Sequence, residues 1–160
     1  PANSESLAKA VGRTNFRYTQ YINRMHNRSG HLWQNRFFSC PLDRQHFWLA
    51  LRYIETNPLK AGIVRSPSKY KWSSAAAHLG KADDDSLIDV AKWRQISARI
   101  NWKQKLARGC SEEEIEIIRK ATNIGRPLGK DSFISKLEKF VGKRLRPLPV
   151  GRPKKNRKKR

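Results

Sequence analysis

The sequence predicts a mostly α-helical protein with one or two strands and a disordered basic tail. Three observations support this fold class. Apolar residues recur every three or four positions along most of the chain, which is the spacing of one helix face. One short aromatic run, residues 36–42, has the composition of a strand. The last eighteen residues contain ten Lys or Arg and no acid, a composition that cannot bury enough apolar surface to fold.

The first predicted helix begins at Asn3 or Ser4, either of which can cap it, and runs to about His26. The aromatic run follows after a turn, and Pro41 confines it to the edge or the end of a strand. Because one strand cannot form a sheet alone, we expect further strands before residue 1.

The next predicted helix covers residues 44–56, with Asp43 as its cap. Pro58 is expected to stop or redirect it, and a further short helix can start there and cover residues 59–64. The expected buried stripe of the longer helix consists of four apolar residues: Phe47, Ala50, Leu51 and Ile54.

The second half of the chain is predicted to be helical after a basic loop, a small helix over residues 73–79 and an acidic linker over residues 80–86. Ser111 and the three glutamates after it form a strong helix start, because acids favour the positive end of a helix dipole. The last two helices are compatible with a helix-turn-helix, although any helical hairpin gives the same pattern. The four helical segments are residues 88–97, 100–108, 111–123 and 131–141.

Charge is the strongest global signal. The 160 residues include 35 Lys or Arg against 13 Asp or Glu, which gives a net charge of +22. A polyanion is the natural partner, because neutralised phosphates release counterions. No apolar run approaches the ~18 residues that span a bilayer, so nucleic acid is favoured over a membrane. The alternative is a basic protein of a large assembly.

Several classes of site find no support in the sequence. Cys40 and Cys110 lie in unrelated contexts, so neither a zinc site nor a disulfide framework is expected, which suits a reducing cytosol. The four histidines have no metal-ligand spacing. Without a Gly-rich nucleotide loop, a nucleophilic serine motif or a close pair of acids, protease, kinase and dehydrogenase functions have no basis.

The basic tail contains Gly151-Arg152-Pro153-Lys154-Lys155, which resembles the core of an AT-hook. In such a core an extended arginine enters the narrow minor groove of A·T tracts. Arg152, Lys154 and Lys155 are therefore candidate DNA-binding residues. A nonspecific phosphate-binding tail explains the composition equally well.

Tyr53 and Asn57 lie one helical turn apart, so both side chains project from the same face of the predicted helix. A phenol beside a polar carbonyl group, with arginines nearby, is suited to attack on a phosphodiester. Taken alone, the two residues have simpler explanations. The tyrosine is a packing residue with its hydroxyl in water, and the asparagine is a cap before Pro58.

Three stretches together resemble the single-tyrosine HUH transposases, in the branch associated with repetitive extragenic palindromes. They are Gly30-His31-Leu32-Trp33-Gln34-Asn35-Arg36-Phe37, then Leu51-Arg52-Tyr53-Ile54-Glu55-Thr56-Asn57-Pro58-Leu59-Lys60-Ala61-Gly62, and then Tyr70-Lys71-Trp72-Ser73-Ser74. A later block, Gly125-Arg126-Pro127-Leu128-Gly129, and the basic tail are also similar to that group. The resemblance covers roughly residues 5–80.

The resemblance implies an α+β fold with a ferredoxin-like core, and a tyrosine that attacks DNA to form a 5′-phosphotyrosine and a free 3′-hydroxyl. Tyr53 matches this nucleophile. Mg²⁺ or Mn²⁺ polarises the phosphate in that family, and Asn57 matches one metal ligand. The implied substrate is single-stranded hairpin DNA, the working unit is usually a homodimer, and the implied location is the bacterial cytoplasm, associated with the nucleoid.

The chain departs from the family pattern in one respect. The metal site of that family also needs a His-hydrophobe-His pair on a central strand, and none occurs in the 160 residues. We expect that pair and its strands just before residue 1, so that the chain is a C-terminal part. Such a part should bind DNA but cleave it poorly or not at all, because a protonated phenol is a poor nucleophile without an activated phosphate.

Two hypotheses follow: a transposase that cleaves and rejoins hairpin DNA, or a catalytically inactive binder of hairpin DNA or structured RNA. The expected organisation is a catalytic part over residues 1–80, a helical DNA-binding region over residues 81–142 and the tail over residues 143–160. Besides the tail residues, the candidates for contact with DNA are Arg36, Arg52, Lys60, Arg65 and Arg126.

Overall fold

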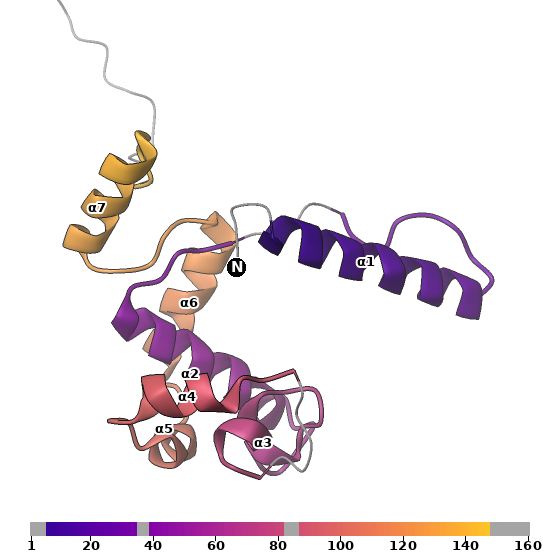
Figure 1. The fold of residues 1–160 in the computed structure, drawn as a ribbon, viewed down its shortest axis with the longest axis horizontal. Helices are drawn as coiled ribbons and strands as arrows, with labels where there is room; N and C mark the ends of the chain where they lie inside the picture. The colour runs from indigo at the N-terminus through magenta and orange to yellow at the C-terminus, as the bar shows by residue number, and fades with distance from the viewer. Residues whose placement is uncertain (1–5, 35–38, 82–86, 148–160) are drawn as a thin grey trace, which may run out of the picture. The chain divides into compact units, whose positions relative to one another are not determined.

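The structure is a computed structural model that describes residues 6–34, 39–81 and 87–147. These residues form helices and connecting loops (Figure 1). The chain divides into two compact units, Pro1–Ser39 and Cys40–Arg160. None of the helices within the described ranges is long and apolar enough to span a membrane.

The first unit contains α1 (Ser6–Met25), which agrees with the predicted helix. The segment after the helix returns along it. There the Trp33 indole donates a hydrogen bond to the Asn15 carbonyl (3.3 Å), and the Trp33 and Tyr18 rings lie 6.1 Å apart. The Asn23 amide closes the intervening turn by donating to the Gly30 carbonyl (3.0 Å).

The second unit is built around α2 (Arg44–Lys60). The elements that follow are η1 (Pro67–Lys69), α3 (Ala75–His78), α4 (Val90–Ser97), α5 (Trp102–Arg108), α6 (Glu112–Ile124) and α7 (Asp131–Val141). The last four lie close to the helices predicted from apolar spacing. The starts of α4, α5 and α6 follow from capping, since Asp89, Asn101 and Ser111 each accept a hydrogen bond from a backbone N–H of the first turn.

A cluster of three tryptophans forms the centre of this unit. Trp48 of α2, Trp93 of α4 and Trp102 of α5 meet with ring centroids 5.5 to 5.8 Å apart. Leu106 of α5 is buried in the same cluster, and Leu51 of α2 packs against it. Residues on both sides of the acidic linker therefore share one core.

The predicted α+β fold class is wrong for the described residues, although the expectation of a mostly helical chain fits. They contain no sheet, and hence no ferredoxin-like core; a single parallel bridge joins Leu42 to Leu128. Residues 39–42 form only this bridge, in which the Pro41 carbonyl accepts from the Leu128 N–H (3.0 Å), and Pro41 has no N–H to donate to a longer ladder. Residues 36–38 of the predicted strand lie outside the described residues.

The expected stop at Pro58 is also wrong. Helix α2 continues to Lys60, and the separate short helix over residues 59–64 does not form. Proline frees the carbonyl of Ile54, four residues earlier, and that residue is largely exposed. The helix ends where the Ile63 N–H bonds back to the Pro58 carbonyl (3.0 Å) and Gly62 takes a positive φ of 72°.

The buried stripe expected on α2 is only partly right, because Leu51 packs against the tryptophan cluster but the buried face extends towards Arg52 and Glu55. Phe47 and Ile54 are 39% and 60% exposed, whereas Arg52, Glu55 and Thr56 are buried. Trp48 packs in the tryptophan cluster, so its face of α2 is buried. Arg52 and Glu55, four and seven positions later, lie on that same face. Polar residues are buried there because each has a hydrogen-bonding partner, as described below.

The basic segment after α7 is ordered for its first few residues. Glu138 accepts hydrogen bonds from the Leu145 N–H (2.8 Å) and the Arg146 N–H (3.0 Å), and it also pairs with the Arg146 guanidinium. Residues 143–147 therefore fold back onto α7, contrary to the expected start of disorder at residue 143. Residues 148–160 lie outside the described residues, and so does the AT-hook-like segment.

Candidate functional site

Tyr53 and Asn57 lie on one face of α2, as their spacing predicts, and both line a cavity of about 300 Å³. Tyr53 is half-buried and Asn57 is exposed. Lys60 lines the same cavity one turn further on, and Cys110 lines it from the loop before α6. The phenol, a carboxamide and an ammonium group therefore share one recess.

The start of α2 is fixed by Asp43. Its carboxylate accepts from the His46 N–H (2.9 Å), the His46 ring (2.7 Å) and the Lys130 N–H (2.8 Å). Burial raises the pKa of Asp43, but these hydrogen bonds and the nearby His46 outweigh it and lower the pKa to about 2. The cap thus joins α2 to the loop before α7.

A second recess of about 320 Å³ lies on the other side of Asn57. Its lining includes Tyr70, Trp72 and Ser74, and the Trp72 side chain is 77% exposed. Two of the three stretches that carry the family resemblance therefore meet at Asn57. The stretch over residues 30–37 belongs to the other compact unit.

The residues around Tyr53 do not fit a Mg²⁺ or Mn²⁺ site. Such an ion takes several oxygen ligands, yet Glu112 is the only carboxylate among the described residues that line the Tyr53 cavity. Glu112 is already paired with the Lys60 ammonium group at 2.5 Å. No cluster of three or more His, Cys, Asp or Glu that could hold a metal occurs in the described part of the chain. Asn57 alone is not a metal site.

Arg52, a predicted DNA contact, is only 6% exposed. Its guanidinium donates to Glu114 at 2.5 Å, and its Nε has no partner among the described residues. Glu114 also completes the capping box of α6 with Ser111. Burial raises the pKa of Glu114, but hydrogen bonds from Ser111 and Arg52 outweigh it and lower the pKa. Arg52 joins α2 to α6 and does not face solvent.

The other predicted DNA contacts differ in exposure. Lys60 and Arg65 are exposed, Lys60 being paired with Glu112. The half-buried Arg126 donates from its guanidinium to the Leu145 carbonyl (3.2 Å). Four lie outside the described residues: Arg36, Arg152, Lys154 and Lys155.

Sequence reasoning missed Glu55, a fully buried carboxylate two residues from Tyr53. One oxygen accepts from the Ser74 hydroxyl (2.6 Å) and lies 2.5 Å from His78 Nδ1; the other accepts from the Trp102 indole (2.9 Å). The group thus joins α2 to α3 and α5. The available signal was the spacing of Trp48, Arg52 and Glu55, which places all three on one helix face.

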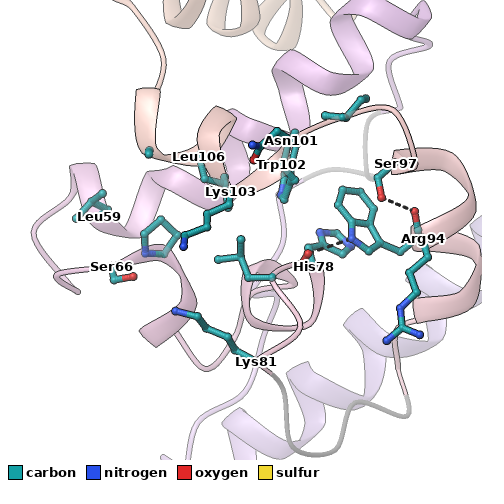
Figure 2. Close-up of a pocket in the computed structure, with 15 residues that line it drawn as sticks. Leu59, Ser66, His78, Lys81, Arg94, Ser97, Asn101, Trp102, Lys103 and Leu106 are labelled. Atoms are coloured by element: carbon teal, nitrogen blue, oxygen red, sulfur yellow. Dashed lines mark hydrogen bonds between the residues drawn. The ribbon is translucent and has the colours of Figure 1, made fainter.

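A larger cavity of about 620 Å³ was also missed (Figure 2). Its floor contains Trp93 and Trp102, and three cationic side chains line it: Lys81, Arg94 and Lys103. The cations come from three separate elements, the loop after α3, α4 and α5, so no single local pattern pointed to the cavity.

Comparison with known proteins finds no matching family model, no matching curated protein and no matching solved structure.

Proposed function

We propose that the protein is a DNA-binding transposase that acts on single-stranded hairpin DNA, with Tyr53 as its nucleophile. The observation that carries this proposal is the shared cavity, in which Tyr53, Asn57 and Lys60 surround one recess. The net charge of +22 supports a polyanionic partner, and the resemblance of three stretches to the single-tyrosine transposases supplies the reaction.

In the proposed reaction the Tyr53 hydroxyl oxygen attacks the scissile phosphorus. A tyrosine–phosphorus bond forms and the bond from phosphorus to the 3′ oxygen breaks. The phenol loses its proton, and the leaving oxygen gains one to become a 3′-hydroxyl. Lys60, which borders the same recess, supplies positive charge near the phosphate once its ammonium group exchanges Glu112 for the phosphate. Because the donor set around Asn57 does not fit a divalent ion, no step is assigned to a metal.

A second candidate is a binder of hairpin DNA or structured RNA that does not cleave it. The incomplete donor set around Tyr53 favours this candidate, since a phenol attacks slowly unless the phosphate is activated. Both candidates require hairpin binding. They differ in whether a covalent bond to Tyr53 ever forms.

The separating experiment incubates the protein with a 5′- or 3′-labelled single-stranded hairpin and Mn²⁺, and detects covalent adducts on a denaturing gel. We expect hairpin binding and a small amount of adduct that disappears in Tyr53→Phe. Tyr70→Phe serves as the matched control, because Tyr70 is also half-buried but lies outside the Tyr53 cavity.

An adduct that persists in Tyr53→Phe would contradict the assignment of the nucleophile. Tight binding with no adduct at any Mn²⁺ concentration would establish the non-catalytic binder instead. Failure to bind the hairpin at all would contradict both candidates.

A further inference from the structure

The cavity of about 620 Å³ lies between α3, α4 and α5 and does not include Tyr53. Its volume is in the range of small-molecule sites. Its floor is apolar: Trp93 and Trp102 lie beside Leu79, Ile100 and Leu106. Both indole N–H groups are already used, donating to the His78 carbonyl (3.1 Å) and to Glu55 (2.9 Å). The tryptophans therefore offer only apolar surface to a ligand.

The rim of this cavity is positively charged. The side chains of Lys81, Arg94 and Lys103 are exposed, and none of these three side chains forms a hydrogen bond or ion pair with another described residue. No acidic side chain is found among the described residues that line the cavity. Three cations that have no acidic partner among the described residues, around an apolar floor, favour an anion with an apolar body.

The cations are distributed over both sides of the cavity. Figure 2 shows Lys81 and Lys103 on the side of Ser66, and Arg94 on the opposite side. A fatty acid or a free nucleoside monophosphate carries charge at one end only. A nucleoside within a strand has a phosphate on each side of its sugar, which matches cations on both sides.

Polar groups for recognition of a base are also present. The Asn101 carbonyl oxygen accepts from the Gln104 N–H (3.0 Å), which leaves its amide N–H groups to a ligand. The Ser66 hydroxyl lies 3.2 Å from that of Ser68 and has hydrogen-bonding capacity left. Base edges that are not paired in a duplex can use such groups.

We propose that this cavity holds one unpaired nucleotide of a nucleic-acid strand, with its base on the Trp93–Trp102 floor and its flanking phosphates at Lys81 and Lys103 on one side and Arg94 on the other. The inference rests on the proposed function for the identity of the polymer. It adds a site, separate from Tyr53, that distinguishes unpaired from paired nucleotides.

The test measures fluorescence anisotropy of a labelled 12-nucleotide oligothymidylate and of a labelled blunt 12-base-pair duplex at one fixed salt concentration. Lys81→Ala/Lys103→Ala should weaken binding of the single strand by about tenfold more than binding of the duplex, because a strand whose phosphates are no longer held there also loses the stacked base, which contributes ~1–3 kcal/mol. The control is Lys105→Ala/Lys120→Ala, which removes the same charge from exposed positions that do not line the cavity. It should weaken both ligands alike.

An unchanged ratio of single-strand to duplex affinity in the cavity variant would overturn the proposal. Competition by free thymidine monophosphate below 1 mM, with that ratio unchanged, would identify a free nucleotide as the ligand and overturn the assignment to a strand. A second readout is photocrosslinking of a 4-thiothymidine oligonucleotide, which should map to residues that line the cavity; crosslinks confined to segments outside that lining would contradict the site. If the wild-type protein binds the single strand but neither binds the hairpin nor forms an adduct, the proposed function fails and the cavity proposal stands.

Discussion

At Glu55, one carboxylate determines how three helices meet. It is fully buried, and its oxygens satisfy polar groups of Ser74, His78 and Trp102. A buried charge is tolerated only when it is paired and hydrogen-bonded. The network also lies between two candidate sites, because Glu55 is two residues from Tyr53 and its partners His78 and Trp102 line the larger cavity.

Glu55→Ala should lower the free energy of unfolding by about 3–5 kcal/mol, because it leaves buried donors without an acceptor and opens a void. Glu55→Gln should cost less: Ser74 and His78 can each switch to accepting a hydrogen bond, whereas the Trp102 indole only donates. Urea denaturation followed by tryptophan fluorescence measures both. Glu116→Ala on the exposed face of α6 should change stability by less than ~0.5 kcal/mol; an equal effect at both positions would contradict the network.

Asp43 gives a prediction about pH. Its pKa in the folded protein, about 2, lies below the ~3.9 of an unfolded aspartate. Such a group stabilises the folded state above pH ~4 and loses that contribution as the pH falls from ~4 towards 2. Asp43→Asn keeps an acceptor at the cap but does not titrate.

We therefore expect Asp43→Asn to be about 1 kcal/mol less stable than the wild type at pH 6, a figure discounted for partial exposure of the carboxylate, and equally stable near pH 2. Urea unfolding between pH 2 and pH 6 measures the difference. A stability gap that stays constant over this range would refute the assigned pKa.

At the scale of elements, the segment Gly125–Gly129 connects two distant parts of the second unit. The Leu128 carbonyl accepts from the Asp43 N–H (3.1 Å), and the Cys40 thiol donates to the Arg126 carbonyl (2.6 Å). Burial raises the pKa of the Cys40 thiol. This block, noted in the sequence for its resemblance to a transposase segment, has a structural role at the start of α2.

Gly129→Ala should destabilise the second unit by about 1–3 kcal/mol, because a Cβ there would lie 2.4 Å from Phe133 Cδ1 and 3.1 Å from the Asp43 Cβ. Gly12→Ala is the control, since a Cβ in the middle of α1 meets nothing within 4 Å. This control substitution should raise the free energy of unfolding by ~0.5–1 kcal/mol, or raise the helix content of α1. Thermal unfolding by circular dichroism measures both, and a tolerated Gly129→Ala would contradict this packing.

Helix positions were predictable from the sequence because capping and apolar spacing are local. Ser111 with its glutamates and Asp43 both cap helices as expected. The buried face of α2 was not predictable, because the tryptophans at positions 93 and 102 decide it from across the fold. The Tyr53–Asn57 pair depends only on one turn of helix and was found, whereas Glu55 and the larger cavity depend on long-range contacts.

For the whole molecule, positive charge is the main support for the proposed polyanionic partner. Residues 148–160 alone contain seven Lys or Arg, and the AT-hook-like segment lies among them. The described residues add the cationic rim of the larger cavity and the exposed Arg65. Binding should therefore depend steeply on salt.

Deletion of residues 148–160 should weaken DNA binding and lower the magnitude of the log–log salt slope by about 2–5, since each neutralised phosphate contributes ~0.7–0.9. The cut leaves Arg146 and its contacts with Glu138 in place, so the fold of α7 is kept. Anisotropy titrations at several salt concentrations give the slope. An unchanged slope would exclude the tail from the DNA interface.

The measurement that tests the central claim most directly is competition between a single-stranded hairpin and a blunt duplex of equal charge for the full chain at about 150 mM salt. The proposed function predicts that the hairpin displaces the duplex with at least about tenfold higher affinity, because unpaired nucleotides reach sites that a duplex cannot fill. Equal affinities, or no binding of either ligand, would contradict the assignment of this protein to hairpin DNA.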